Sequence, residues 1–473
     1  MKGIVKISGL TVLLGGLASC ENSMPEKPMN VIYILVDDLG YGDLGCYGQQ
    51  LVKTPHLDNM ANEGMRFTQH YSGSTVSAPS RCVLMTGLHT GHAQIRGNQE
   101  VNPEGQVPMS EDTYTLAKMF NLKGYSTGLF GKWGLGYPGS ESDPNKMGFD
   151  EFYGNNCQRK AHTFYPEYMW HNQEKVHFSG NKKNARQVYG HDLIHNQALN
   201  FIREHKDEPF FAMLTYTLPH AELAVPKDSI YDMYDAIFNE KPSDAWKSYE
   251  GGGYYPPEKR HTSFAAMVSR LDMHVGEILA ELEKLGLDDN TLVIFTSDNG
   301  PHMEGGADPN YFNSAGPLRG VKRDLYEGGV RVPMIAWSPG FIPSGEESDH
   351  ISAFWDVMPT LADMLEVDLP VETDGISFLP TLRAKGDQQN HAYLYWEFHM
   401  KNGIHKQSVR DGEWKFIYNL KPIKNQASIE LFNLKEDLGE NTNLANKYPE
   451  KIKIYQHIIN KARTESSLFK SVK

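Results

Sequence analysis

The chain has 473 residues, of which 40% are hydrophobic and 22% charged, and this ordinary globular composition excludes a disordered protein. Its 46 basic and 59 acidic residues give a formal net charge of −13, which disfavours a nucleic-acid-binding protein and, at first sight, an enzyme of polyanions. Four cysteines are too few for a scaffold built on disulfides, and the length allows roughly two to three domains.

The N-terminus resembles an export signal. Lys2 and Lys6 precede a short apolar run over residues 7–18, which is shorter than the roughly 20 residues that span a bilayer. The run ends at Cys20 in a sequence that resembles a bacterial lipobox, which implies that Cys20 becomes the lipidated first residue of the mature protein. The alternative is a plain signal peptide with a chance cysteine. The polar residues 20–28 predict a tether.

Removal of the signal, residues 1–19, would change the counts of charged residues only slightly. The mature chain would carry 44 basic and 59 acidic residues, a net charge of −15. Cys46, Cys82 and Cys157 would remain besides Cys20, so at least one thiol stays free, and the pattern leaves open whether any disulfide forms. No later segment is apolar enough to span a membrane. We therefore expect an exported protein, lipid-anchored in the periplasm or on the cell surface.

Continuous apolar runs predict buried parallel strands at residues 30–36, 209–215, 291–296 and 333–337. Helical patterns lie between them, for example at residues 113–122 and 264–285. This alternation predicts an α/β domain over residues 29–375, with a large, mostly parallel sheet flanked by helices.

The pattern changes after about residue 375. Residues 393–398 and 413–418 look like short strands, and residues 449–463 predict an amphipathic terminal helix. Residues 376–473 are therefore expected to form a smaller α+β subdomain.

Two pairs of oxygen-bearing side chains directly follow predicted strands. Asp37 and Asp38 follow the first strand, and Asp298 and Asn299 follow the third in chain order. Ligands gather at the carboxyl ends of parallel strands, and hard oxygen ligands suit Ca²⁺ or Mg²⁺ rather than zinc. A single such pair would more often be a helix cap or turn. Two pairs predict a metal site.

Three motifs resemble the signatures of the sulfatase family. The first is Ser77-Ala78-Pro79-Ser80-Arg81 with Thr86-Gly87, the second spans residues 124–133 and includes Lys132, and the third spans residues 318–329 and includes Lys322. Three motifs in the family's order leave little room for chance. The resemblance, from about residue 29 to near the C-terminus, implies an alkaline phosphatase-like fold.

The resemblance implies a catalytic cycle at Ser77. This residue would be oxidised to formylglycine (3-oxoalanine), whose hydrate attacks the sulfur of a sulfate ester and then expels sulfate with return of the aldehyde. Unmodified serine lacks the second hydroxyl that makes the last step possible. A serine, rather than a cysteine, at this position resembles sites matured by an anaerobic sulfatase-maturating radical enzyme.

The other roles implied by the family fall on matching positions. Asp37, Asp38, Asp298 and Asn299 would hold one Ca²⁺, with Mg²⁺ less favoured. Arg81 would hold the hydrate and balance the carboxylates, Lys132 and Lys322 would bind sulfate oxygens, and His220 would be the general acid for the leaving alcohol.

One position departs from the family pattern. The histidine that commonly follows the Gly-Lys-Trp of the second signature is replaced by Gly134. We expect His162 to deprotonate the hydrate instead; alternatively, the cluster of Arg159 and His162 only binds substrate or packs. His302 and Asp308 follow the second oxygen pair and are expected to contact sugar hydroxyls, unless they form only a turn. Tyr165, Tyr168 and Trp170 offer stacking surface or core packing.

These features favour an exported sulfuric ester hydrolase acting on sulfated carbohydrate. The resemblance is closest to galactose and N-acetylgalactosamine sulfatases, with 6-O-sulfate favoured over 4-O-sulfate. The alternatives are a phosphonate or phosphodiester hydrolase of the same superfamily and a non-catalytic lipoprotein that binds sulfated glycans. The exact sugar, endo or exo action, the oligomeric state and the face of the outer membrane are not decided by the sequence.

Overall fold

The computed structural model describes residues 28–249, 253–400, 403–421 and 426–470. The predicted export signal, Cys20 and the tether as far as residue 27 lie outside these described residues. None of the helices in these ranges combines the length and the apolar character required to cross a bilayer. The three cysteines in these ranges are free, so the structure forms no disulfide among them.

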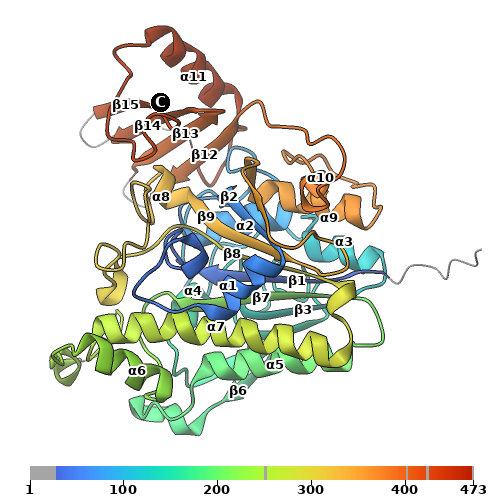
Figure 1. The fold of residues 1–473 in the computed structure, drawn as a ribbon, viewed down its shortest axis with the longest axis vertical. Helices are drawn as coiled ribbons and strands as arrows, with labels where there is room; N and C mark the ends of the chain where they lie inside the picture. Colours follow the sequence, from blue (N-terminus) through green and yellow to red (C-terminus); the bar gives the residue numbers. More distant parts are fainter. Residues whose placement is uncertain (1–27, 250–252, 401–402, 422–425, 471–473) are drawn as a thin grey trace, which may run out of the picture.

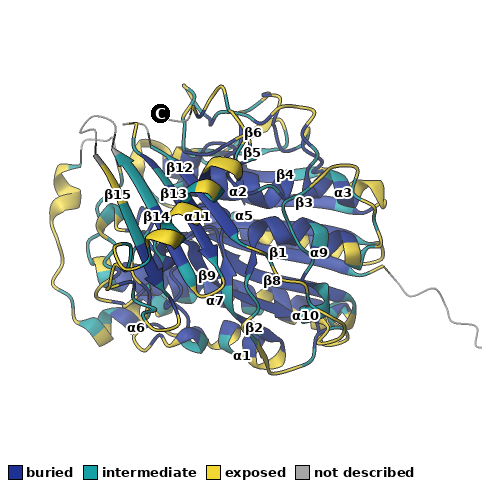
Figure 2. Ribbon diagram, turned by 90° about the horizontal axis from the view of Figure 1, so that it is seen from above, coloured by how far each residue is buried: buried dark blue, intermediate teal, exposed yellow. Residues whose placement is uncertain are grey.

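The larger sheet has its most buried strands at its centre (Figures 1 and 2). Its five central strands, β8 to β4 in the order across the sheet, are parallel, and β9 is antiparallel to both of its neighbours. The mostly parallel sheet flanked by helices is thus confirmed. The order across the sheet is β10 (Glu346–Ser348), β2 (Met65–Tyr71), β9 (Arg331–Trp337), β8 (Thr291–Ser297), β1 (Asn30–Asp37), β7 (Phe210–Pro219), β3 (Ser126–Lys132), β4 (Glu151–Asn155), β5 (Tyr168–His171) and β6 (Glu174–His177), with β11 (Ser352–Ala353) beside β2.

Alternation along β1 divides the core into two layers. Val31, Tyr33 and Leu35 face one side, where they pack with α2 (Ser77–Thr86), α3 (Leu116–Leu122) and α9 (Val357–Met364). The intervening apolar residues of β1 face the other side, with α1 (Pro55–Glu63), α5 (Gly190–Glu204) and α7 (Arg260–Leu285). Helices therefore cover both faces, as a parallel sheet requires.

Two predicted helix boundaries were wrong. The helix expected at residues 113–122 begins only at Leu116, because the Thr115 side chain caps it by accepting a hydrogen bond from the Lys118 N–H. The helix expected from residue 264 begins at Arg260, because its first turn is polar and lacks the apolar signal. The other helices are α4 (Gln158–Ala161), α6 (Ser229–Phe238), α8 (Glu327–Val330) and α10 (Leu379–Leu382), with 3₁₀ turns at Gly45–Tyr47, Ser179–Asn184, Ala245–Ser248, Asp288–Asn290, Glu304–Gly306 and Phe354–Asp356.

A four-stranded antiparallel sheet packs above the larger sheet in Figure 1 and carries the C-terminal helix. Its strands are β12 (Leu394–His399), β13 (His405–Asp411), β14 (Trp414–Lys421) and β15 (Gln426–Asn433), and the helix is α11 (Pro449–Lys461). Two of these strands were expected from the sequence, whereas β13 and β15 were missed. The division at residue 375 stays a prediction.

A buried ionic cluster fastens the two sheets together. The Glu327 carboxylate, fully buried at the start of α8, accepts hydrogen bonds from the Tyr71 hydroxyl at 2.5 Å and from Lys415 Nζ on β14 at 2.8 Å. Removing one member of such a cluster would leave the other charge buried without its counter-charge, which would destabilise the contact between the two sheets.

Candidate active site

The four predicted oxygen ligands meet at the carboxyl ends of β1 and β8. These strands pair in parallel, with Val36 opposite Ser297, so the residues that follow them emerge side by side. The Asp38 N–H donates to Asp298 Oδ1 at 3.3 Å, and Asn299 Nδ2 donates to Asp38 Oδ1 at 2.7 Å. All four side chains are fully buried, so the convergence expected from the sequence is present.

The backbone at these strand ends is shaped to hold the cluster. Asp38 has a φ of 65°, a left-handed conformation that aspartate tolerates better than most residues and that turns the chain sharply out of the strand. Gly300 lies against α8, where a Cβ atom would be 1.8 Å from the Gly328 carbonyl oxygen. Only glycine therefore permits the close approach of these two loops.

Three cations surround the three carboxylates, one against each. Lys132 Nζ, at the end of β3, donates to Asp37 Oδ2 at 2.5 Å. The guanidinium of Arg81 on α2 donates twice to Asp298 Oδ2, at 2.9 and 3.0 Å.

The third cation comes from the loop before α8. Lys322 Nζ donates to Asp38 Oδ2 at 2.8 Å. Burial lowers the pKa of Lys132, whereas Asp38 and Glu304 outweigh burial at Lys322 and raise its pKa above the ordinary value. All three cations are nearly inaccessible to solvent, so their attraction for an anion is weakly screened.

Ser77 lies at the centre of this cluster, as the first residue of α2. Its Oγ donates to Asp37 Oδ1 at 2.8 Å and accepts from Lys132 Nζ at 3.2 Å. The N-terminus of a helix carries partial positive charge, which adds to the attraction for an anion at this point.

Two stacked histidines form one wall of the cluster. The rings of His162 and His220 lie 3.8 Å apart at an interplanar angle of 16°. His220 Nδ1 donates to the Ala221 carbonyl at 2.5 Å, so its Nε2 carries the lone pair and lies 2.9 Å from Lys322 Nζ. His162 Nε2 is 4.0 Å from Asp37 Oδ2 and has no hydrogen-bond partner among the described residues. Burial and neighbouring positive or histidine groups lower the pKa of both imidazoles well below the usual value.

The donor set fits a divalent cation. The carboxylates and the Asn299 amide are hard ligands, and Asn299 Oδ1 is buried without a partner among the described residues. Burial and the adjacent Asp37 raise the pKa of Asp298 to about 7 despite Arg81, and a bound divalent cation would favour the ionised carboxylate. The formal charges of the three carboxylates and the three cations also sum to zero. A bound divalent cation would make the site positive and attract an anionic substrate.

The structure explains why glycine stands at position 134. Gly134 has a φ of 78°, and a Cβ atom there would lie 3.2 Å from Cγ and Nε2 of Gln158. The Gln158 side chain, 5% exposed, therefore occupies the space into which a side chain at 134 would project. Gln158 begins α4 and precedes His162 by one turn, so both residues belong to the same short helical segment.

The remaining predicted residues lie at varied distances from the cluster. His302 is buried, with its ring 5.1 Å from that of His220, and Asp308 pairs with Arg260 at 3.0 Å and with His261 at 3.2 Å. Arg159 is exposed on α4 and donates to the Pro103 carbonyl at 2.8 Å. Direct contact of these three side chains with substrate stays a prediction.

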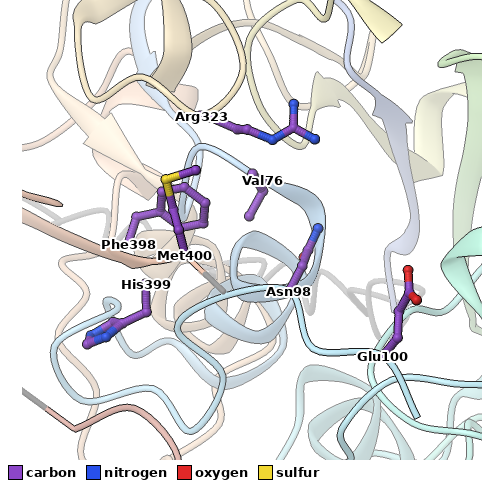
Figure 3. A pocket seen from close by; sticks show the side chains of 7 residues that line it. All are labelled: Val76, Asn98, Glu100, Arg323, Phe398, His399 and Met400. Atoms are coloured by element: carbon purple, nitrogen blue, oxygen red, sulfur yellow. The ribbon is translucent and has the colours of Figure 1, made fainter. Parts of the chain in front are cut away.

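A cavity of about 380 Å³, here called the Ser77 pocket, opens beside Val76, the residue before Ser77 (Figure 3). In Figure 3, Val76 lies between the side chains of Arg323 and Asn98, and residues 398–400, at the end of β12 and just beyond it, line the other side. Asn98 Oδ1 accepts from the Ala78 N–H at 3.2 Å, which leaves its Nδ2 to donate elsewhere. Asn98 was not predicted from the sequence, because it belongs to none of the three motifs. Arg323 was not predicted either, although it directly follows Lys322 in the third motif.

The sequence and the fold of the chain are similar to those of known proteins. A family profile described as Sulfatase matches residues 29–367, and one described as N-sulphoglucosamine sulphohydrolase, C-terminal, matches residues 321–466. The chain is 32% identical to the N-acetylgalactosamine-6-sulfatase of Mus musculus, over 82% of this chain and 72% of that protein. It is 28% identical to the N-acetylgalactosamine-6-O-sulfatase of Bacteroides thetaiotaomicron, over 97% and 99% of the two chains. The solved structure of Ps i-CgsB superposes with a TM-score of 0.75 at 27% identity, covering 92% of this chain and 93% of that one.

The crowding at Gly134 can be measured against a matched glycine. Gly139 has nearly the same φ, 77°, but a Cβ atom there would have no neighbour within 4 Å. We expect Gly134→Ala and Gly139→Ala each to lose about 1 kcal/mol of unfolding free energy from left-handed strain, and Gly134→Ala to lose about 1 kcal/mol more from contact with Gln158. Urea denaturation measures both. The additional loss in Gly134→Ala should disappear when Gln158 is also replaced by alanine. Equal losses at the two glycines would contradict the conclusion that Gln158 occupies the space beside Gly134.

Proposed function

The chain belongs to the sulfatase family and is a sulfuric ester hydrolase, and we propose that it removes 6-O- or 4-O-sulfate from galactose or N-acetylgalactosamine in host or algal glycans. The observation that carries the proposal is the meeting of Ser77, two buried lysines and four oxygen ligands in one cluster. The names of the relatives from Mus musculus and Bacteroides thetaiotaomicron support the 6-position of N-acetylgalactosamine as the first choice.

Members of the family generally use a formylglycine and a divalent metal. We assign the formylglycine to Ser77, formed by an anaerobic radical maturating enzyme, and the metal to Ca²⁺ on Asp37, Asp38, Asp298 and Asn299. When present, the formylglycine hydrate supplies a nucleophile with a second ionisable hydroxyl, and the bound cation supplies Lewis acidity.

The chain's own residues hold the sulfate and orient the nucleophile. Lys132 Nζ lies 3.2 Å from Ser77 Oγ, and Lys322 Nζ lies 2.8 Å from Asp38. Both lysines would bind the non-bridging oxygens and stabilise charge that grows in the transition state. Asp37 Oδ1, 2.8 Å from Ser77 Oγ, fixes the direction of the residue-77 side chain. Arg81 neutralises Asp298 and anchors on the Lys132 carbonyl at 2.6 Å, which keeps α2 against β3.

The two histidines would move the protons. Because His220 Nδ1 is committed to the Ala221 carbonyl, Nε2 is the atom that faces the leaving alcohol, and it would pass to that alcohol a proton taken from the Lys322 ammonium 2.9 Å away. His162 Nε2 faces Asp37 across 4.0 Å without a hydrogen-bond partner among the described residues, so it is placed to accept a proton near residue 77. It would thus do the work of the histidine that Gly134 replaces.

The sugar ring would occupy the Ser77 pocket. Arg323 and Asn98 offer N–H donors and Glu100 offers an acceptor, the groups that hydroxyls and an acetamido group require. Export and a lipid anchor at Cys20, in the periplasm or on the cell surface, would give the enzyme access to such glycans.

A panel of defined substrates tests the proposal. We expect release of sulfate from the 6-sulfates of N-acetylgalactosamine and galactose, and weaker release from the 4-sulfates. A methylphosphonate ester should react much more slowly, because its methyl group replaces one of the three non-bridging oxygens that the lysines and the cation would hold. Ion chromatography measures sulfate, and mass spectrometry of the residue-77 peptide should show loss of two hydrogens from a hydroxymethyl side chain. A faster phosphonate reaction would favour a phosphonate hydrolase, and an unmodified peptide in protein from the native host would favour a glycan-binding lipoprotein.

The role of His162 is tested by turnover of the best substrate. His162→Ala should lower kcat by about a hundredfold, the scale of a lost general base, while the unfolding free energy changes little. The matched control is His171→Ala, whose side chain is 43% exposed on β5. Unchanged turnover in His162→Ala would leave the residue as a packing partner of His220.

A further inference from the structure

A second hollow begins beside the histidine pair. Tyr254 forms its inner wall, with its ring 5.8 Å from that of His220 and 5.9 Å from that of His162. This hollow has a volume of about 430 Å³ and is also lined by Gly305 and Gly306. The Tyr254 ring therefore lies between this hollow and the histidine proposed to act on the leaving alcohol.

One ion pair joins a residue next to the lining of the hollow to a residue that lines the Ser77 pocket. Glu304, which precedes the two glycines, lies 2.5 Å from Arg323 Nη1, and Arg323 lines the Ser77 pocket. A substrate whose sulfated ring sits in the Ser77 pocket would therefore extend past this pair toward Tyr254.

An adjoining cavity of about 440 Å³ continues the hollow to the surface, and the two share Pro257 and Glu258 as walls. Its lining includes the rings of Tyr255 and Trp246, and Trp246 is 38% exposed. The two cavities together, from Tyr254 to Trp246, are here called the outer groove.

The aromatic wall of the outer groove is held rigidly. The Arg186 guanidinium lies 4.5 Å from the ring centroid of Tyr165 and 4.2 Å from that of Tyr255, and it pairs with Glu222 at 3.1 Å. Glu222 is two residues beyond His220, and its N–H donates to the His162 carbonyl at 3.1 Å. The wall is thus fixed to the segments that carry both histidines.

The polar rim offers donors and acceptors rather than a block of one charge. Lys227 pairs with Glu258 at 2.6 Å, and Arg260 pairs with Asp308 at 3.0 Å. Flat aromatic faces suit the C–H faces of sugar rings, and paired polar groups suit their hydroxyl edges. A cation-lined channel would instead be expected for recognition by repeated sulfates.

We propose that the outer groove binds the sugar residues that adjoin the sulfated one, so that the enzyme acts on oligosaccharides in preference to free sulfated monosaccharides. This inference rests on the proposed function. Trp246 and Tyr255 are assigned as the stacking platforms, and Tyr254 as the wall between the reacting sugar and its neighbour.

The test compares N-acetylgalactosamine 6-sulfate with a chondroitin tetrasaccharide that carries a single 6-sulfate, on its terminal N-acetylgalactosamine. In the wild type, kcat/KM should be roughly tenfold or more higher for the tetrasaccharide. Trp246→Ala should lower that ratio roughly tenfold. Trp414→Ala, a partly buried tryptophan on β14 of the other sheet, should leave the ratio unchanged. Equal rates on both substrates, or a ratio insensitive to Trp246, would overturn the proposal.

Binding measured without turnover separates this inference from the proposed function. Tryptophan fluorescence of the wild type is titrated with desulfated tetrasaccharides of chondroitin and of a galactan, and the Trp246→Ala variant is the control. A saturable change lost in the variant would support the groove even if neither sulfate were hydrolysed. No change with either saccharide would overturn the groove even if the monosaccharide sulfate were turned over.

Discussion

The parallel pairing of β1 with β8 is the constraint on which the rest of the site depends. It brings Asp37 and Asp38 beside Asp298 and Asn299, about 260 positions later in the chain, and buries them completely. Buried carboxylates require compensation, which here comes from cations on three separate segments. Each cation therefore compensates one carboxylate, and under the proposed function Lys132 and Lys322 would also bind the sulfate. Ser77 is fixed by the same arrangement, because it shares Asp37 and Lys132.

This arrangement reconciles an acidic protein with an anionic substrate. The net charge of −13 describes the whole molecule, whereas a buried site attracts or repels through its own few charges. The carboxylates of the proposed metal site account for part of the negative count. With a divalent ion bound, the net charge around residue 77 would become positive. The low dielectric of the interior would then strengthen the attraction between the site and the sulfate group.

The elements that position the site could be predicted from the sequence because each carries a local signal. Apolar runs followed by acidic residues identify β1, β8 and the side chains that converge after them, and the family motifs identify Ser77, Lys132 and Lys322 as members of the same cluster. Gln158 could not be predicted as the occupant of the space at Gly134, because that contact joins two segments with no shared pattern. Tyr254 was missed for the same reason. The strands β13 and β15 were missed because their polar residues weaken the alternating signal.

The most direct test of this account is the metal site itself. Protein stripped with a chelator is titrated with Ca²⁺ in a calorimeter, and thermal unfolding is recorded with and without the ion. The expected result is one ion per chain, a higher Tm when calcium is bound and weaker binding of Mg²⁺. Asp298→Asn should lose the binding, whereas Asp308→Asn, which changes a carboxylate paired with Arg260, should retain it. Absence of calcium binding in the wild type, or equal binding by Asp298→Asn, would contradict the assignment of these four residues as the ligands.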